Sequence, residues 1–289
     1  MPVKKGGYHF FALLIVIVWG TTFTSTKIVL LAGLTPESIF FYRFLLAYAG
    51  IWFFGKTQLF AENWKDEMYF ILLGISGGSA YFLTENYALE YTFTSNVALL
   101  VCTAPLYTTL LCHWFLKSEK ITKRLIQGIL IALLGVGLVV FNGHFILKLN
   151  PLGDLLSMAA ALCWAIYSIV LMKVNHRYSN VLITRKTFFY GLLTVLPVFY
   201  FHPLQTDTAI LLQPQVWGNL LFLGVVASLL CFFCWNLIVK GLGAILSTNY
   251  VYINPIIALI ASAVIMHEQI TLFAIIGTLL ILIGVIRSA

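Results

Sequence analysis

Long apolar runs, separated by short polar connections, make up almost the whole chain. Ten runs can be traced, each near the roughly 20 residues that a helix needs to cross a bilayer. They cover residues 9–31, 36–55, 68–88, 94–116, 125–142, 152–172, 180–201, 216–239, 244–266 and 272–286. This pattern predicts an all-α membrane protein with ten transmembrane helices.

The composition agrees with a lipid environment. Hydrophobic residues make up 61% of the chain and charged residues only 9%, whereas a soluble domain usually carries about 25% charged residues. The lipid bilayer is therefore an expected partner. The net charge of +7 is better explained by the placement of Lys and Arg between the apolar runs than by nucleic-acid binding, so no nucleic-acid partner is expected.

The positive charges predict the orientation in the membrane. If the amino terminus is cytoplasmic, fourteen Lys and Arg residues fall in cytoplasmic segments and only Lys148 falls outside. The fourteen are Lys4, Lys5, Lys56, Lys65, Lys117, Lys120, Lys123, Arg124, Lys173, Arg177, Arg185, Lys186, Lys240 and Arg287. Such an excess is typical of cytoplasmic loops. We expect a multi-pass protein of the cell inner (plasma) membrane, with both termini cytoplasmic.

The two halves of the chain repeat one order of residues. Pro105, Glu119, Thr122, Gly128 and Gly135 recur, at offsets of 149 or 150, as Pro255, Glu268, Thr271, Gly277 and Gly284. Trp19 and Asn86 likewise recur as Trp164 and Asn236. Each half holds five spans, an odd number, so the second half must enter the membrane upside down. We therefore expect two inverted five-helix repeats, residues 1–145 (helices 1–5) and 146–289 (helices 6–10).

Short motifs add a family resemblance. The sequence carries W-G-T-T-F at Trp19–Phe23, Y-R-F-L-L-A at Tyr42–Ala47, A-P-L at Ala104–Leu106 and N-P-I at Asn254–Ile256, the last two each followed by a loop glutamate. Across both halves it resembles the EamA-like branch of the drug/metabolite transporter superfamily. The family often has Gly before that glutamate, where this chain has Ser118 and His267. The resemblance implies ten helices, cytoplasmic termini, a cavity between the halves and export of small metabolites; some relatives export amino acids, including aromatic ones.

Three charged residues inside the spans of the first half are functional candidates, because a charge costs roughly 3 kcal/mol or more at the bilayer centre. Lys27, Arg43 and Glu85 have similar inferred depths, toward the outer side. In the functional interpretation a cation holds a substrate carboxylate, and Glu85 accepts an ammonium group or a coupling proton. In the structural alternative Arg43 pairs with Glu85 and Lys27 extends toward the interface. Glu85 aligns with Trp235, so the fold's symmetry does not require its charge.

Aromatic and amide side chains complete the candidate substrate site. Trp19, Trp164 and Trp235 lie inside spans, with Tyr81 and Tyr167 a turn from Glu85 and Trp164. An indole N–H needs a partner that a polar cavity would provide, although ordinary packing is an equal alternative. Among the asparagines, Asn249 is a candidate lining residue, and the symmetric Asn86 and Asn236 are expected to cross-link helices. Pro105 and Pro255 predict matching kinks.

Other readings of single motifs are weaker. Gly74-Ile75-Ser76-Gly77-Gly78 fits G-x-S-x-G, and His113 is the one histidine well inside a span, so an intramembrane serine hydrolase stays an alternative. The G-x-x-x-G formed by Gly74 and Gly78 instead predicts close helix contact. Five cysteines, among them the C-x-x-C at Cys231 and Cys234, are expected to be packing residues. No nucleotide fingerprint occurs, so neither a cofactor nor a metal is expected.

The combined expectation is a transporter with alternating access between inverted halves, and not an enzyme. It would export a small metabolite, plausibly an amino acid (aromatic ones included) or a related amphipathic compound, as a monomer driven by protons or a solute gradient. A sugar-phosphate or nucleotide-sugar exchanger stays open, but it needs several cations at mid-depth where only Lys27 and Arg43 are near. A channel is the remaining class.

Overall fold

The computed structural model describes residues 5–55, 58–92, 94–115, 122–141, 150–257, 260 and 271–288. Within these ranges the chain is helical and contains no strand. The first repeat consists of α1 (Lys5–Leu31), α2 (Pro36–Ile51), η1 (Trp52–Phe54), α3 (Trp64–Gly74), η2 (Ile75–Ser79), α4 (Ala80–Tyr91), α5 (Thr94–Val101), α6 (Ala104–Phe115) and α7 (Lys123–Phe141).

The second repeat follows the same plan. It consists of α8 (Pro151–Val174), α9 (Asn180–Val195), η3 (Leu196–Tyr200), α10 (Thr208–Leu211), α11 (Pro214–Leu221), η4 (Phe222–Leu230), α12 (Cys231–Leu242), α13 (Ala244–Asn249), η5 (Tyr250–Ile253) and α15 (Leu272–Ser288). Each of the ten predicted spans contains helix, and five helices of the described chain are long and apolar enough to cross a membrane. The predicted boundary between residues 145 and 146, and the repeated loop glutamates Glu119 and Glu268, lie outside the described residues.

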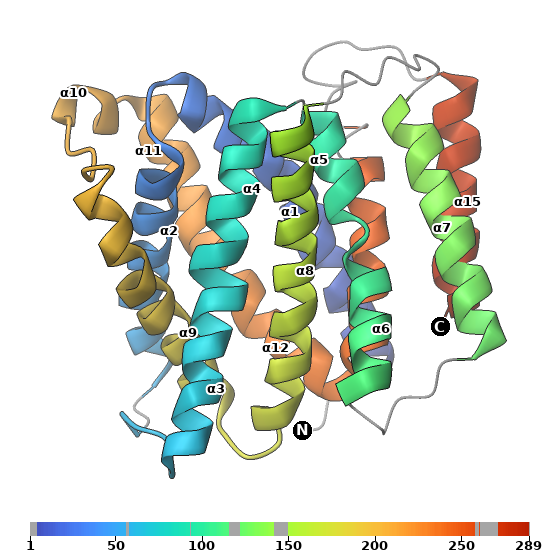
Figure 1. Ribbon diagram of the computed structural model, residues 1–289, viewed down its shortest axis with the longest axis horizontal. Coiled ribbons are helices and arrows are strands. Elements are labelled where there is room, and N and C mark those ends of the chain that lie inside the picture. The colour runs from blue at the N-terminus through green and yellow to red at the C-terminus, as the bar shows by residue number, and fades with distance from the viewer. Residues whose placement is uncertain are drawn as a thin grey trace.

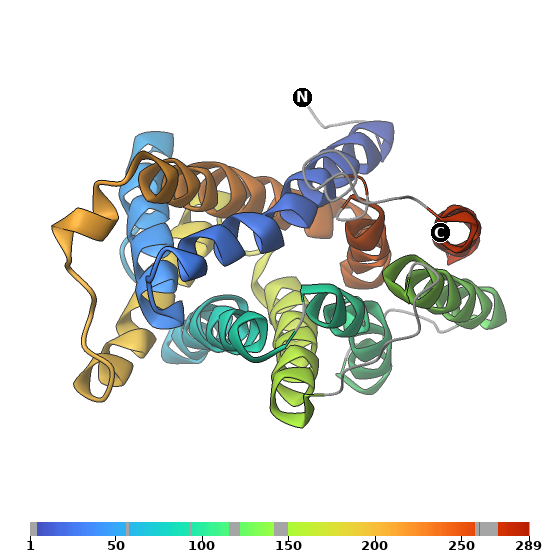
Figure 2. The same cartoon turned by 90° about the horizontal axis from the view of Figure 1, so that it is seen from above.

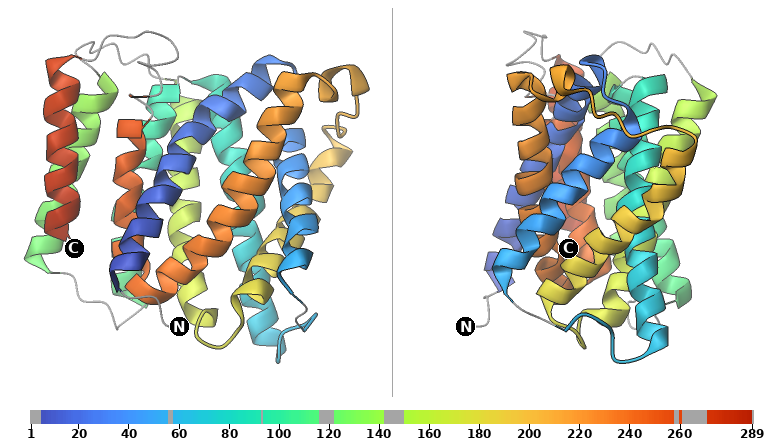
Figure 3. Two further views of the ribbon diagram at one scale, coloured as in Figure 1. Left: turned by 180° about the vertical axis from the view of Figure 1, so that it is seen from behind. Right: turned by 90° about the vertical axis from the view of Figure 1, so that its left-hand side faces the viewer.

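The two repeats are inverted relative to each other. In Figure 1, α1 rises from the lower edge of the bundle, whereas α8, the first helix of the second repeat, descends from the upper edge. As a result α1 begins and α15 ends toward the same side (Figure 3), which we call the termini side; the opposite side is the far side. The inversion deduced from the odd number of spans is therefore confirmed.

The spaced glycines bring α7 and α15 together at one edge of the bundle (Figure 2). A Cβ on Gly135 would lie 2.6 Å from the carbonyl oxygen of Gly277, and a Cβ on Gly284 would lie 2.6 Å from that of Gly128. These two contacts are equivalent under the repeat, because Gly128 and Gly135 correspond to Gly277 and Gly284. The glycine spacing thus encodes a symmetric helix crossing.

Adding one methyl group at this crossing tests it. We expect Gly135→Ala to lower the thermal stability of the detergent-solubilised protein, because overpacking costs about 1–3 kcal/mol. Gly137→Ala is the matched control, since a Cβ there meets no atom within 4 Å and Ala favours the helix by about 1 kcal/mol. Equal melting temperatures for the two variants would contradict the crossing.

Matching breaks divide the helices around the centre. The fourth span is interrupted at Cys102–Thr103, just before Pro105, and the ninth turns into η5 just before Pro255. Both prolines therefore lie in the first turn after a break, where their missing N–H is tolerated. Each kink predicted from the sequence thus coincides with an interruption of regular α-helix.

The asparagine pair cross-links helices in both repeats. The Asn86 side chain donates to the carbonyl of Pro36, at the start of α2. The Asn236 side chain donates to Thr184 of α9 and accepts from the Tyr167 hydroxyl at 2.5 Å. In each repeat the third span is thus tied to the second, as the symmetry of the two asparagines predicted.

Two ion pairs join α3 to the second repeat on the termini side. Arg177 contacts both Asp66 oxygens, at 2.7 and 2.5 Å. Lys186 pairs with Glu67, which also accepts from the Tyr190 hydroxyl and the Ala61 amide. Burial alone would raise the pKa of Glu67, but the bonds from Lys186 and Tyr190 outweigh it and hold that pKa below its usual value.

Breaking the buried pair should destabilise the fold. Lys186→Met leaves the Glu67 carboxylate buried without its cation, which typically costs about 3–5 kcal/mol. We expect a large fall in melting temperature, measured in detergent, and recovery of much of it in the double variant Lys186→Met/Glu67→Gln, in which neither charge remains. A double variant as unstable as the single one would contradict this account.

Candidate functional site

An aromatic contact marks the seam between the repeats. The rings of Trp19 (α1) and Trp164 (α8) meet edge to face, with centroids 5.1 Å apart. The rings of Phe82 (α4) and Phe232 (α12), which correspond at an offset of 150, have centroids 6.2 Å apart. Because each pair joins equivalent positions of the two halves, the pseudo-twofold axis passes through this aromatic cluster.

A cavity opens beside this cluster. Its wall is formed by Trp19, Thr22, Phe23, Arg43, Tyr81, Phe82, Glu85, Val101, Ala104, Trp164, Phe232, Val251 and Asn254. Eight of these thirteen residues form four equivalent pairs, because Val101 also matches Val251, and Ala104 matches Asn254. Both repeats therefore build the cavity, at the place where an inverted-repeat transporter binds its solute.

The cavity is small in this conformation. Its volume is about 30 Å³, which is room for on the order of two water molecules. A solute the size of an amino acid therefore requires the surrounding helices to move apart. The described conformation is a contracted one.

Arg43 is the cation of the site. Its side chain comes from α2, is only 2% exposed, and lies with its guanidinium carbon 4.0 Å from the Phe82 ring centroid. Nε donates to the Ser228 hydroxyl at 3.0 Å, while the buried Nη1 has no hydrogen-bond partner among the described residues. A guanidinium held on one edge and unpaired on the other can receive an anionic group from a solute.

Glu85 supplies the opposite charge from α4. It is 5% exposed, and its Oε1 accepts a 2.7 Å hydrogen bond from the Tyr81 hydroxyl one turn earlier. Within the described chain, Arg43 and Glu85 make no ion pair, so the structural alternative of a direct pair between them is not formed. The cavity wall thus presents a cation and a carboxylate that do not neutralise each other by contact.

Both charges belong to the first repeat, so the site is polar on one side only. The positions of the second repeat that match Tyr81 and Glu85 carry Cys231 and Trp235. The second repeat contributes instead the Asn254 side chain, whose Oδ1 is buried without a partner in the described structure, as is the Trp164 indole N–H. Within the described chain, the second repeat therefore adds one unpartnered donor, Trp164 N–H, and one unpartnered acceptor, Asn254 Oδ1, to the cavity wall.

Five of the nine residues predicted to bind substrate line this cavity: Trp19, Arg43, Tyr81, Glu85 and Trp164. The other four lie elsewhere in this conformation. Lys27 donates to the Leu89 carbonyl near the end of α4 at 2.7 Å, Tyr167 is bonded to Asn236, and Trp235 is fully buried under the Trp pair. Asn249 is fully buried at the end of α13.

Sequence reasoning missed several lining residues that the repeat could have identified. Phe82, Phe232, Val101 and Val251 are ordinary apolar residues within spans, so composition does not distinguish them. They match in pairs at an offset of 150, and a search for like residues at equivalent positions would have selected them. Thr22 and Phe23 have no such signal beyond their place next to Trp19.

The motifs that suggested other chemistry have structural roles. The Ser76 hydroxyl donates to the Leu72 carbonyl of its own helix, and the His113 side chain is exposed on α6, so the two do not form a nucleophile–base pair. A Cβ on Gly74 would lie 2.4 Å from Tyr190 Cβ, which confirms the close helix contact predicted from G-x-x-x-G. Arg43 is the one Lys or Arg among the described residues around the cavity, fewer cations than a sugar-phosphate site needs.

Comparison with known proteins identifies the family of this chain. The sequence profile of the EamA-like transporter family matches residues 7–141 and, a second time, residues 151–288. The chain belongs to the EamA-like transporter family. Membership agrees with the all-helical membrane fold and the two-repeat plan, and it points to a transporter and not to an enzyme.

Relatives in this family match over nearly their whole length. An uncharacterized transporter of Archaeoglobus fulgidus is 25% identical over 96% of this chain and 95% of its own. A probable amino-acid metabolite efflux pump of Salmonella typhimurium is 27% identical over 97% of this chain and 93% of its own. A crystal structure that is 18% identical superimposes with a TM-score of 0.78 over 99% of this chain and 98% of its own, which supports the fold alone.

Proposed function

We propose that this EamA-like protein exports small amphipathic metabolites, and that amino acids, aromatic ones included, are its first substrate class. The observation that carries the proposal is the pairing of charges in one cavity wall: Arg43, whose buried Nη1 has no partner in the described structure, and Glu85 both line the same cavity. A zwitterion offers a carboxylate to the first and an ammonium group to the second.

The aromatic frame favours a solute with a flat apolar part. Trp19, Trp164 and Phe232 line the cavity with Tyr81 and Phe82, and such rings bind a ring or an aliphatic chain through large contact areas. The amino-acid metabolite efflux pumps among the relatives agree with this class. Transport would proceed by alternating access and would be driven by protons or by the solute gradient. The protein would act as a monomer in the inner membrane, with both termini in the cytoplasm.

A transport screen tests the substrate class. Proteoliposomes containing the purified protein would be loaded with unlabelled solute, and uptake of radiolabelled amino acids, nucleosides and sugars would be measured, with protein-free liposomes as the control. We expect saturable exchange of amino acids, greater for phenylalanine, tyrosine and tryptophan than for alanine or glycine. Exchange of sugars or nucleosides without exchange of amino acids would overturn the proposal.

A further inference from the structure

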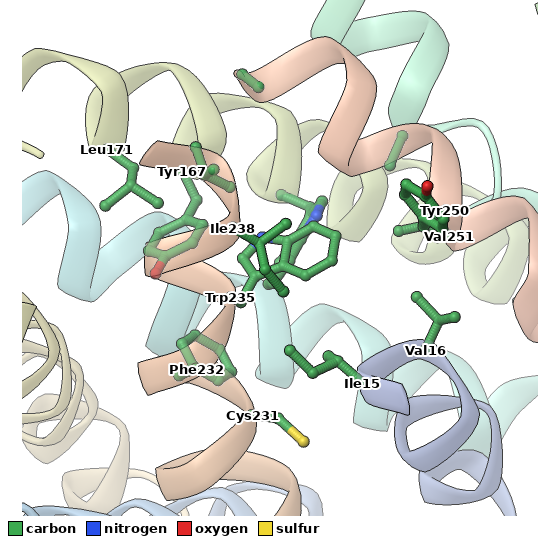
Figure 4. Close-up of a cluster of buried hydrophobic side chains, with 14 of the residues drawn as sticks. Ile15, Val16, Tyr167, Leu171, Cys231, Phe232, Trp235, Ile238, Tyr250 and Val251 are labelled. Carbon is green, nitrogen blue, oxygen red and sulfur yellow. The ribbon is translucent and has the colours of Figure 1, made fainter. Parts of the chain in front are cut away.

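Glu85 and Trp235 occupy equivalent positions but have different surroundings. Trp235 on α12 is fully buried, with its ring centroid 4.9 Å from that of Trp19 and 6.0 Å from that of Trp164. It lies among side chains of α1, α8 and α12 (Figure 4). Glu85 on α4 lines the cavity. From these residues α4 runs toward the far side and α12 toward the termini side (Figure 1). The packed Trp235 thus lies toward the termini side of the seam, and the small cavity lies toward the far side.

The helices that carry these two residues are jointed at matching places. The π-helical segment η2 (Ile75–Ser79) precedes α4, and η4 (Phe222–Leu230) precedes α12; an offset of 150 places the first within the second. Gly78 in η2 has a non-helical backbone (φ −124°, ψ −107°). Interruptions of this kind mark bends and often functional sites. The helix can therefore bend at η2 and at η4, and Glu85 and Trp235 lie in the half-helices beyond these bends.

Inverted repeats produce the alternate state when the two halves exchange conformations. In that state Trp235 would line the open space on the termini side, and Glu85 would take the packed position against the tryptophans. That position holds an indole in the described structure, and a charged carboxylate there would be sealed among aromatic rings. The chain can close its far side at low cost only if this carboxyl group loses its charge.

We propose that, with no solute bound, the far half of the cavity closes only when Glu85 is protonated, so that one proton accompanies each closure of the empty site. The carboxylate takes the proton from water on the far side and releases it to water on the termini side once that half has opened. This inference rests on the proposed transport function and deepens it, because it assigns the coupling step to one residue and names the proton as the coupled ion.

The charged and titratable groups around Glu85 support this assignment. Arg43 of α2 lines the same cavity without forming an ion pair with Glu85, and the Tyr81 hydroxyl of α4 donates a hydrogen bond to Glu85 Oε1. Cys102 lies near Tyr81. The Lys27 ammonium group of α1 donates a hydrogen bond to the Leu89 carbonyl. The neighbouring wall residues from α5 and α8, Val101 and Trp164, do not titrate. The Arg43 guanidinium is tied to Ser228 of the second repeat, so it is not free to follow Glu85.

Reporter cysteines test the proposal without any solute. Cys102, Cys112, Cys163, Cys231 and Cys234 would be replaced by serine or alanine, and a single cysteine would be introduced. Thr22→Cys reports on the cavity, and Ile238→Cys, one turn beyond Trp235, reports on the termini side. The probe is a membrane-impermeant methanethiosulfonate applied to proteoliposomes of known orientation, and each rate is divided by that of the denatured protein at the same pH.

With Glu85→Gln we expect labelling of Thr22→Cys to slow about tenfold or more, equivalent to about 1.4 kcal/mol, and labelling of Ile238→Cys to rise. Lower pH should shift the rates in the same direction in protein that keeps Glu85, and should have no effect once Glu85→Gln is present. The exposed Glu90, also on α4, supplies the control variant Glu90→Gln.

Unchanged rates in Glu85→Gln, or a pH response that survives that substitution, would overturn the proposal. If Glu85→Gln does not fold, the pH series on the reporters with Glu85 intact decides the question alone, and a pH-independent result counts against it. Failure here would leave the substrate screen untouched, because no solute is present in the labelling experiment.

Discussion

Solute flux through proteoliposomes is expected to fall about tenfold to a hundredfold when Glu85 is replaced by glutamine, because a hydrogen bond to a charged group contributes about 1.5–3 kcal/mol. Glutamine keeps the shape of the side chain and can still accept from the Tyr81 hydroxyl, but it cannot bind an ammonium group as a carboxylate does or carry a proton across. The measurement is the initial rate of exchange of a radiolabelled amino acid.

Two controls separate a mechanistic loss from a folding defect. The yield and melting temperature of Glu85→Gln should match those of the unmodified protein, since the substitution removes a buried charge that has no ion pair in the described structure. Glu90→Gln, on the exposed face of the same helix, should transport normally. Flux unchanged in Glu85→Gln would remove Glu85 from the mechanism.

Much of the architecture was predictable because it depends on patterns spread along the chain. Apolar runs identify helices, and the repeated order of Pro105 and the spaced glycines identifies a duplication. The odd number of spans then dictates the inversion that Figure 1 shows. The glycine spacing was informative because a Cβ at Gly135 or Gly284 would meet backbone atoms of the partner helix, so the sequence records the contact directly.

The site was harder to predict because its geometry depends on long-range contacts. Arg43 and Glu85 were identified by the cost of charge in a membrane, yet the sequence could not reveal that Arg43 would bond Ser228, 185 positions away. Trp235 and Tyr167 share residue types with the true lining residues, but they lie on the packed termini side of the seam. In the proposed alternating-access cycle, the side of the tryptophan pair that is open changes with the conformation, and a single sequence has to suit both conformations.

The asymmetry between the repeats explains how a symmetric frame can handle a polar solute. Paired residues such as Phe82 and Phe232 surround the pseudo-twofold axis with apolar surface that suits either conformation. The charged residues of the described cavity wall, Arg43 and Glu85, both come from the first repeat. The proposed solute recognition and the proposed proton step are therefore concentrated on α2 and α4, while the second repeat supplies packing that includes Trp235.

Arg43→Lys should abolish most transport of carboxylate-bearing solutes while it preserves the positive charge. Lysine lacks the planar fork that lets Nε bond Ser228 while Nη1 stays available, and it cannot stack as closely on Phe82, 4.0 Å from the guanidinium carbon. We expect exchange of phenylalanine to fall about tenfold or more, because a charge-assisted contact from a fixed guanidinium is replaced by one from a flexible ammonium group.

The comparison that isolates this role uses a solute without a carboxylate. Phenethylamine, which keeps the ring and the ammonium group of phenylalanine, would compete for the site in the unmodified protein and in the Arg43→Lys variant. Its apparent affinity should change far less between the two proteins than that of phenylalanine. Melting temperatures of both proteins, measured in detergent, control for lost packing at Phe82. An equal loss of affinity for phenylalanine and phenethylamine would contradict the prediction. It would mean that Arg43 stabilises the fold and does not bind the solute carboxylate.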